Sequence, residues 1–154
     1  MAKIFETENF TIESPDEKPH ITRLDGGHIW ILPKVGISDR TKLSPSLAKE
    51  LMMLTMITGQ AMTTAMNEQG VDIGRINYQE NGNWSVFDPK GPYLHEHIYG
   101  RAKSAKIQKY GDALHFPHLE TGFYDDNQPL TSDDCSKIKV EIERLLQEDR
   151  YINF

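Results

Sequence analysis

The segment Pro92-Tyr93-Leu94-His95-Glu96-His97-Ile98 carries two histidines that are separated by one residue. Apolar and aromatic residues surround them, and the pattern predicts a strand over residues 93–99. Side chains alternate between the two faces of a strand, so one face would hold Tyr93, His95, His97 and Tyr99. Neighbours on that face lie roughly 7 Å apart. Two imidazole rings at this spacing can hold one small anion or one metal ion between them.

Two interpretations of this pair lie outside phosphate chemistry. In the first, both histidines are packing or surface residues. In the second, they bind a metal ion, a common use of His-x-His on a strand. That site needs at least one more ligand, which His28, His20 or an aspartate could supply through folding. A cupin-like site would place a glutamate four or five residues after His97, where Arg101 and Ala102 stand instead.

The third interpretation is phosphate chemistry. A neutral imidazole is a competent nucleophile near pH 7 and can attack phosphorus to form a phosphoramidate. A second histidine close by can bind phosphoryl oxygens or pass a proton to the leaving group. Amide and hydroxyl donors would stabilise the charge of the transferring group. Four candidates lie just upstream of the pair: Asn77, Asn81, Asn83 and Ser85.

The chain upstream of the pair predicts two further strands and a long helix. An apolar run over residues 28–32 is typical of a buried strand, and a proline ends it. Ser44-Pro45 supplies an N-cap and a proline at the first helical position. Apolar residues at helical spacing then continue toward Gly70, and these are Leu47, Leu51, Leu54 and Ala61. Residues 73–79 predict another strand. The helix is rich in methionine, for which core or dimer packing is the favoured interpretation.

The two ends of the chain complete an α+β fold. Residues 9–13 and 21–24 predict strands, and the second ends in the hairpin signal Asp25-Gly26-Gly27. Thr131-Ser132-Asp133-Asp134 predicts the capped start of a final helix with acidic residues in its first turn. The expected architecture is an antiparallel sheet with one long central helix and a C-terminal helix.

Length and composition limit the classes of function. The chain has 154 residues, which suits a single domain over residues 1–154. Its net charge of −6 argues against binding to nucleic-acid backbones. A single cysteine, Cys135, excludes an internal disulfide and agrees with a cytoplasmic location. Acidic residues interrupt the N-terminus, so no signal peptide is expected. The uncharged stretch over residues 51–67 is rich in threonine and makes a poor membrane span.

Taken together, these segments resemble the histidine triad (HIT) family. Its signature is three histidines that alternate with apolar residues, often after a strand reading Lys-x-Asn-Tyr and a Gly-Asn pair. Residues 75–78 (Arg-Ile-Asn-Tyr), Gly82-Asn83 and the histidine segment follow that order. Upstream, residues 27–34 (Gly-His-Ile-Trp-Ile-Leu-Pro-Lys) and Leu43-Ser44-Pro45 match the family's strand, loop and helix. The resemblance covers residues 20–102.

The resemblance implies hydrolysis or transfer of a nucleotidyl group at an α-phosphate. His95 takes the position of the family's nucleophile, which forms a nucleotidyl-histidine that water then cleaves. His97 takes the position of the histidine that contacts phosphate and aids the leaving group. The candidate substrate-binding residues are Asn77, Asn83, His28, Tyr93 and Ser85. The triad itself binds no metal, no cofactor is expected, and family members are commonly homodimers with a joined sheet.

Several residues depart from the family pattern. Tyr93 replaces the first histidine but keeps the backbone carbonyl to which the nucleophile's second ring nitrogen donates. Its hydroxyl is a candidate donor to phosphate or to His28. Glu96 replaces an apolar residue, so either that strand face is wet or the carboxylate has a cationic partner. Four basic residues follow the histidines and are candidates for holding distal phosphates: Arg101, Lys103, Lys106 and Lys109.

These observations lead to one first hypothesis and two alternatives. The first is a HIT-type hydrolase, acting on a nucleoside phosphoramidate or a dinucleoside polyphosphate, in which His95 attacks the α-phosphate. In the second, loss of the first histidine has ended turnover, and the pocket binds a nucleotide. The third is a His-x-His metal protein on another fold. Trp84 is the candidate for stacking on a nucleobase, whereas Trp30, inside the buried run, is assigned to the core.

Overall fold

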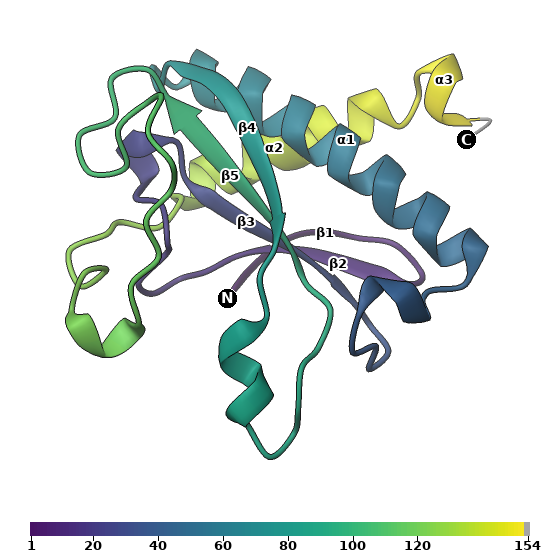
Figure 1. Ribbon diagram of the computed structural model, residues 1–154. Helices are drawn as coiled ribbons and strands as arrows, with labels where there is room; N and C mark the ends of the chain where they lie inside the picture. Colours follow the sequence, from purple (N-terminus) through teal and green to yellow (C-terminus); the bar gives the residue numbers. More distant parts are fainter. Residues whose placement is uncertain (153–154) are drawn as a thin grey trace.

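Five antiparallel strands form one sheet in the computed structural model, which describes residues 1–152 except for the side chain of Asn83 (Figure 1). Their order across the sheet is β1-β2-β3-β5-β4. The strands are β1 (Ala2–Glu6), β2 (Phe10–Ser14), β3 (His28–Pro33), β4 (Ile73–Glu80) and β5 (Glu96–Ala102). The predicted α+β class, an antiparallel sheet with one long helix and a C-terminal helix, is confirmed.

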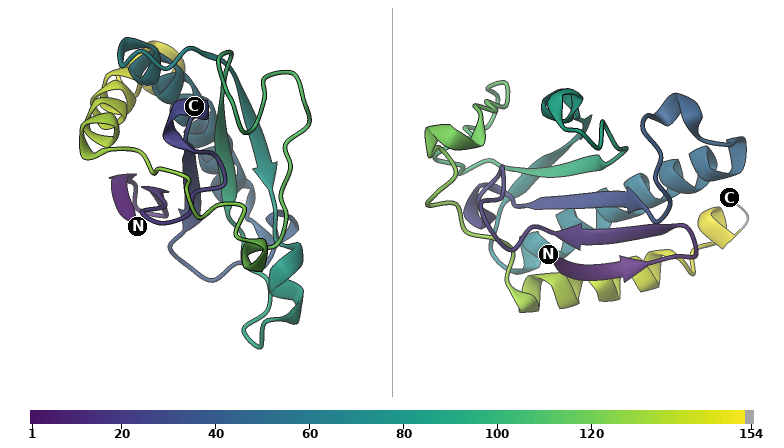
Figure 2. Two further views of the ribbon diagram at one scale, coloured as in Figure 1. Left: turned by 90° about the vertical axis from the view of Figure 1, so that its left-hand side faces the viewer. Right: turned by 90° about the horizontal axis from the view of Figure 1, so that it is seen from below.

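Two helices cover one face of the sheet and leave the other face to loops (Figure 2). α1 (Pro45–Glu68) packs against β3, β4 and β5, and α2 (Ser132–Leu145) packs against α1 and β1. A short helix, α3 (Asp149–Ile152), follows α2. Among the described residues, no helix is both long enough and apolar enough to cross a bilayer.

The core lies between the sheet and the helices. Its α1 residues include Leu51, Leu54 and Ala61, which the helical spacing predicted. Met62 is also buried there, whereas Met52 remains exposed. Only part of the methionine set therefore packs in the core. Ile98 of β5 points into the same core, so strand alternation turns His97 and Tyr99 toward the loop face.

The strand predicted over residues 21–24 is wrong. That segment leads into a 3₁₀ helix (Arg23–Asp25), and the Asp25 side chain is buried. Its carboxylate accepts hydrogen bonds of 2.8 Å from three backbone N–H groups, those of Lys106, Ile107 and Gln108. A buried carboxylate needs such partners. They lie 81 to 83 positions away in the chain, so no local pattern predicts them.

One strand boundary and one additional strand also differ from the prediction. β5 begins at Glu96 rather than at residue 93, because the Leu94 N–H donates to the Ile37 carbonyl in the loop after β3. β1, which the sequence pattern did not indicate, pairs with β2 and forms one edge of the sheet. In both cases the backbone partner lies outside the segment, where a local pattern carries no information about it.

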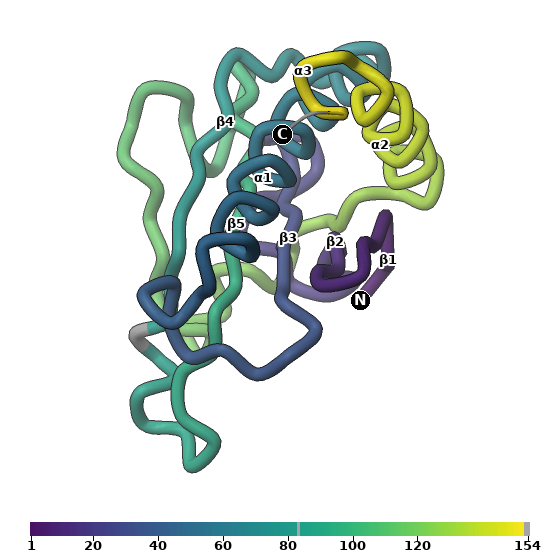
Figure 3. The backbone as a smooth tube through the Cα atoms, turned by 90° about the vertical axis from the view of Figure 1, so that its right-hand side faces the viewer, coloured from purple at the N-terminus to yellow at the C-terminus, as the bar shows by residue number. Residues whose placement is uncertain are grey.

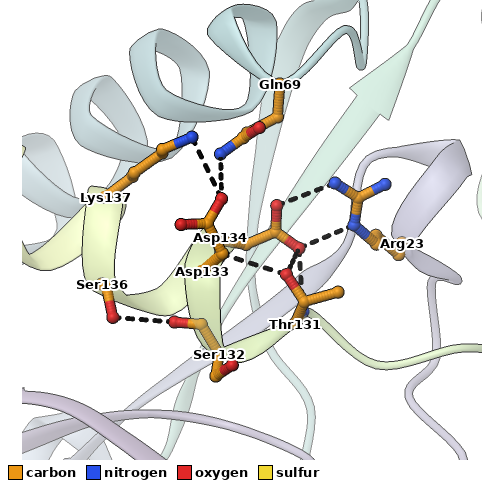
Figure 4. Close-up of polar contacts among 8 residues, drawn as sticks. All are labelled: Arg23, Gln69, Thr131, Ser132, Asp133, Asp134, Ser136 and Lys137. Atoms are coloured by element: carbon orange, nitrogen blue, oxygen red, sulfur yellow. Dashed lines mark hydrogen bonds and ion pairs between the residues drawn. The ribbon is translucent and has the colours of Figure 1, made fainter.

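A polar cluster holds the start of α2, where the sequence predicted a cap (Figure 4). Thr131 Oγ1 accepts from the Asp134 N–H at 3.1 Å, and the Asp134 carboxylate accepts from the Thr131 N–H at 2.8 Å. Arg23 donates two further hydrogen bonds to this carboxylate, at 2.6 and 2.8 Å. Burial raises the pKa of Asp134, but the hydrogen bonds from Arg23 and Thr131 outweigh burial and hold that pKa below its usual value. The cluster ties α2 to the segment before β3.

Replacing Thr131 by alanine should lower the free energy of unfolding by about 1 kcal/mol. The Asp134 N–H then loses its acceptor, and the carboxylate loses the hydroxyl donor. Urea denaturation of the two proteins measures the difference. Ser136→Ala is the matched control, because its exposed hydroxyl donates to the Ser132 carbonyl and takes no part in the cap. We expect a change within about 0.5 kcal/mol there. Equal losses in the two variants would contradict the capping role.

Candidate active site

A cavity of about 580 Å³ opens on the loop face of the sheet. β3 contributes His28 and Trp30 to its lining, and β5 contributes His97. The connecting segments contribute others, including His20, Asn81, Trp84, Ser85, Tyr93, His95, Phe116 and Leu119. Residues that are far apart in the sequence therefore converge around the two histidines of the central segment.

One hydrogen bond sets the orientation of the His95 ring, just before β5. Its Nδ1 lies 2.9 Å from the Tyr93 carbonyl oxygen. A carbonyl only accepts, so Nδ1 carries the ring proton and Nε2 keeps its lone pair. Burial lowers the pKa of His95, which keeps the ring neutral at pH 7. His95 thus has the unprotonated nitrogen that a nucleophile requires.

His97 and His28 form a hydrogen-bonded pair across β5 and β3. Nδ1 of His97 lies 2.9 Å from Nε2 of His28, and the Trp30 indole N–H points at the same His28 nitrogen. The backbone N–H of His20 points at the other ring nitrogen of His28, Nδ1, at 3.3 Å. Burial, followed by the neighbouring histidines, lowers the pKa of His97 to about 2 and that of His28 well below its usual value. Both rings are neutral at pH 7.

His20 joins this cluster from the loop between β2 and β3. Its ring stacks on His28 with centroids 4.9 Å apart, and its Nδ1 lies 2.8 Å from the Tyr99 hydroxyl. Burial lowers the pKa of His20 to about 4. Ring nitrogens of His20, His28 and His97 all lie within 4.8 Å of one another. Neutral imidazoles that converge in this way are a possible ligand set for a metal ion.

Aromatic side chains border the cavity. Trp30 was expected in the core, and that expectation is wrong: its indole lines the cavity, with its centroid 6.1 Å from the His95 ring. Trp84 lies in a 3₁₀ helix (Asn83–Phe87) in the segment between β4 and β5, which projects beyond the sheet (Figure 3). Phe116 comes from the loop after β5, and its ring centroid is 5.3 Å from that of His20. The sequence did not single out Phe116, because it lies outside the region of family resemblance.

The predicted substrate-binding residues do not all reach this cavity. The Tyr93 ring stacks on His95 with centroids 4.6 Å apart. Ser85 lines the cavity and donates its hydroxyl to the Gly82 carbonyl at 2.6 Å. Asn77 lies beside a separate cavity, where its Oδ1 accepts from Arg101 at 2.8 Å. The Asn83 side chain lies outside the described residues.

Glu96 has the cationic partner that its burial requires. Its carboxylate accepts from Arg40 Nη2 at 2.8 Å, and Arg40 also forms an ion pair with Glu80. Burial raises the pKa of Glu96, and the charge of Arg40 opposes that rise. Of the two explanations offered for Glu96 from the sequence, the ion pair is the one observed.

The four basic residues after the histidines lie away from the cavity around His95. Arg101 is buried beside the separate cavity, whereas Lys103, Lys106 and Lys109 are exposed. None of the four is among the described residues that line the His95 cavity. Lys18 does line it, and its ammonium pairs with Asp125 at 2.6 Å.

No protein-family model and no curated protein matches the chain in sequence. Solved structures match it in fold. A histidine triad protein from Marinobacter aquaeolei VT8 has a TM-score of 0.61 at 15% identity, over 94% of this chain and 88% of that one. A hypothetical histidine triad nucleotide-binding protein from Sulfolobus tokodaii has 0.60 at 16%, over 96% and 87%. A Zn-bound histidine triad family protein from Mycobacterium smegmatis has 0.54 at 19%, over 93% and 84%. At these identities the likeness concerns the fold.

Proposed function

We propose that this chain, which has the fold of the histidine triad proteins, is a hydrolase that cleaves nucleotides at an α-phosphate. The substrate class is a nucleoside phosphoramidate or a dinucleoside polyphosphate. The observation that carries the proposal is the hydrogen bond from His95 to the Tyr93 carbonyl, which leaves Nε2 unprotonated in a cavity. The acceptor is a backbone atom, so a tyrosine at position 93 serves as well as the family's histidine.

The proposed reaction has two steps. In the first, His95 Nε2 forms a bond to the α-phosphorus, and the bond from phosphorus to the leaving amine or phosphate breaks. A bound phosphoryl anion favours protonated imidazole, which opposes the effect of burial on His97 and lets its Nε2 hold a proton for the leaving group. In the second step a water oxygen bonds to phosphorus, the water gives a proton to His97 Nε2, the bond from phosphorus to His95 Nε2 breaks, and the nucleoside monophosphate leaves.

The aromatic border of the cavity supports a nucleotide as the substrate. Trp84 and Phe116 are rings on which a base can stack, an interaction worth about 1–3 kcal/mol. The volume also falls within the range of about 300–1,000 Å³ that is usual for small-molecule sites. The base-stacking role that the sequence suggested for Trp84 is retained in this proposal, with Phe116 added.

We also propose a homodimer that forms through β4, and a cytoplasmic location. β4 is an edge strand of the sheet. Tyr78 on β4 and Met56 on α1 are exposed and line one shallow depression. Pairing of two β4 strands would cover these side chains and satisfy the open edge. Cys135 is a free, buried thiol, in keeping with a reducing compartment.

Two alternatives each have one supporting observation. A nucleotide-binding protein without turnover is supported by Tyr93, which replaces an imidazole of the family pattern. A metal-binding protein is supported by the converging nitrogens of His20, His28 and His97. The hypothesis drawn from the sequence placed this metal-binding protein on another fold, and that part of the hypothesis is wrong.

Intact-protein mass spectrometry after mixing with adenosine phosphoramidate, or with diadenosine tetraphosphate, tests the proposal. AMP release is followed in parallel. We expect an acid-labile adenylyl adduct together with AMP. AMP binding without adduct or release would overturn the hydrolase and favour the binding protein. Stoichiometric metal in the purified protein that is lost in His20→Ala would favour the metal site.

A further inference from the structure

A second cavity, of about 520 Å³, lies on the same face of the sheet as the histidines. β4 contributes Arg75, Asn77 and Gln79, and β5 contributes Arg101. The rest of its lining is the loop over residues 110–114. The proposed hydrolase mechanism uses none of these groups.

Two arginines lie opposite each other on the two neighbouring strands that line this cavity. Arg75 of β4 is the register partner of Arg101 of β5, so their side chains start on the same face of neighbouring strands. Like charges placed directly opposite each other destabilise a sheet. Among the residues that the structure describes, no carboxylate forms an ion pair with either guanidinium. The one acidic residue in the lining, Asp112, is exposed.

The Arg101 guanidinium is buried, with 6% of the residue exposed, and it is held rigidly. Nη1 donates to Asn77 Oδ1 at 2.8 Å, and Nη2 donates to the carbonyls of Lys109 and Asp112 at 2.7 and 2.9 Å. All three acceptors are neutral. Its Nε is buried and has no partner among the described residues. A buried cation usually has a counter-ion, so this arrangement has one positive charge and one donor left to satisfy.

Apart from the Asp112 carboxylate, the other polar side chains of the lining add donors. Gln79 Oε1 accepts from Asn81, which leaves the Gln79 amide N–H groups to donate. The Asn77 amide N–H groups are left in the same way, because its Oδ1 accepts from Arg101. The Tyr110 hydroxyl also borders the cavity. Donors from two strands and a loop suit a tetrahedral oxyanion, and arginine forks match phosphate geometry.

The geometry points to a phosphate-binding site between Arg75, Arg101 and the loop over residues 110–114. Its ligand is a phosphate group, either free inorganic phosphate or the distal phosphate of a polyphosphate substrate. Bound phosphate accepts from Arg101 Nε and neutralises the pair of opposed guanidinium groups. Arg101 links the site to the loop, because the same side chain holds the Lys109 and Asp112 carbonyls.

Nuclear magnetic resonance titration of the full chain with inorganic phosphate tests the site. We expect saturable shifts of the Arg101 Nε–H and of the amides of residues 110–114, against a chloride titration at equal ionic strength. Arg75→Ala should weaken this binding about tenfold or more, because it removes a charged donor without touching the buried arginine. Arg101→Lys keeps the charge but loses the fork, and should also weaken it. Arg144→Ala, an exposed arginine on α2, is the matched control and should bind as the parent does.

Absence of saturable shifts in residues 110–114 with every phosphate compound would overturn the inference. So would equal affinity in the parent and Arg75→Ala, or shifts confined to Trp84, Ser85 and His95. A second arm compares AMP with diadenosine tetraphosphate. Shifts at residues 110–114 with the tetraphosphate alone would identify a distal phosphate of a substrate as the ligand, and in that case the inference rests on the proposed function. Shifts at residues 110–114 with inorganic phosphate alone would support the phosphate-binding site whether or not the chain is a hydrolase.

Discussion

His95→Ala is expected to reduce AMP release from adenosine phosphoramidate by about 10⁴-fold or more and to abolish the adenylyl adduct. The variant loses the only nitrogen in the proposal that bonds to phosphorus. Alanine fits the position, because among the described residues the ring hydrogen-bonds to the Tyr93 backbone alone, and it borders an open cavity. The fold should therefore survive, and nucleotide binding should change far less than turnover. Single-turnover AMP release and intact mass measure the two effects.

His115→Ala is the matched control for this experiment. His115 lies in the loop after β5, and its ring contacts Phe123 rather than the described lining of the cavity. We expect its AMP release to stay close to that of the parent protein. If His95→Ala kept parental AMP release while it remained folded, another group would be the nucleophile. If His115→Ala lost as much activity as His95→Ala, the loss would reflect the fold and not the chemistry.

Gly100→Ala is expected to lower the free energy of unfolding by about 3 kcal/mol. A Cβ at position 100 would lie 2.3 Å from the Gly26 carbonyl oxygen and 2.7 Å from its carbonyl carbon. Both are backbone atoms, so no side chain can turn away. Gly26 in turn has φ +129°, which an L side chain rarely adopts, so this close approach requires glycine at both positions. The N–H of Gly100 also donates to the Gly27 carbonyl at 3.1 Å, a bond that the displacement would break.

Chemical denaturation of Gly100→Ala and of Gly36→Ala measures this effect against a matched change. Gly36 has no atom within 4 Å of the position where a Cβ would stand, so alanine should be neutral or stabilise by about 0.5 kcal/mol. Equal stabilities for the two variants would mean that the Gly26–Gly100 contact relaxes at little cost. Because Gly100 follows His97 and Tyr99 on β5, we also expect the displacement to disturb the His97–His28 hydrogen bond.

Local sequence patterns were sufficient for the elements that form their own hydrogen bonds. Ser44-Pro45 begins α1, and the Thr131 to Asp134 signal begins α2, because a helix cap involves residues three positions apart. The buried run after residue 27 forms β3 and the run after residue 72 forms β4, where apolar alternation reports which face is buried. The same alternation placed His97 and Tyr99 together, and the rings stack with centroids 5.2 Å apart.

Partners that are distant in the chain decided what the patterns missed. The segment over residues 21–24 became a turn because the Asp25 carboxylate binds backbone groups 81 to 83 positions away. The same segment places His20 next to His28 and Tyr99. Phe116, which lies in the loop after β5, also contacts the His20 ring. Asn77 faced Arg101 instead of the histidines, because its place along β4 puts it opposite Tyr99, next to the second cavity.

The sequence by itself therefore determined the class of fold, the two helix starts, and the placement of His95 and His97 on one side of the sheet. These features depend on interactions within a few residues, which local spacing encodes. Only the tertiary structure decided the protonation pattern of the histidine cluster, the partner of Glu96, and the opposed arginines of the second cavity. Each of these depends on burial and on charges brought together from separate strands and loops, and desolvation and Coulomb energies follow distance in space, not separation along the chain.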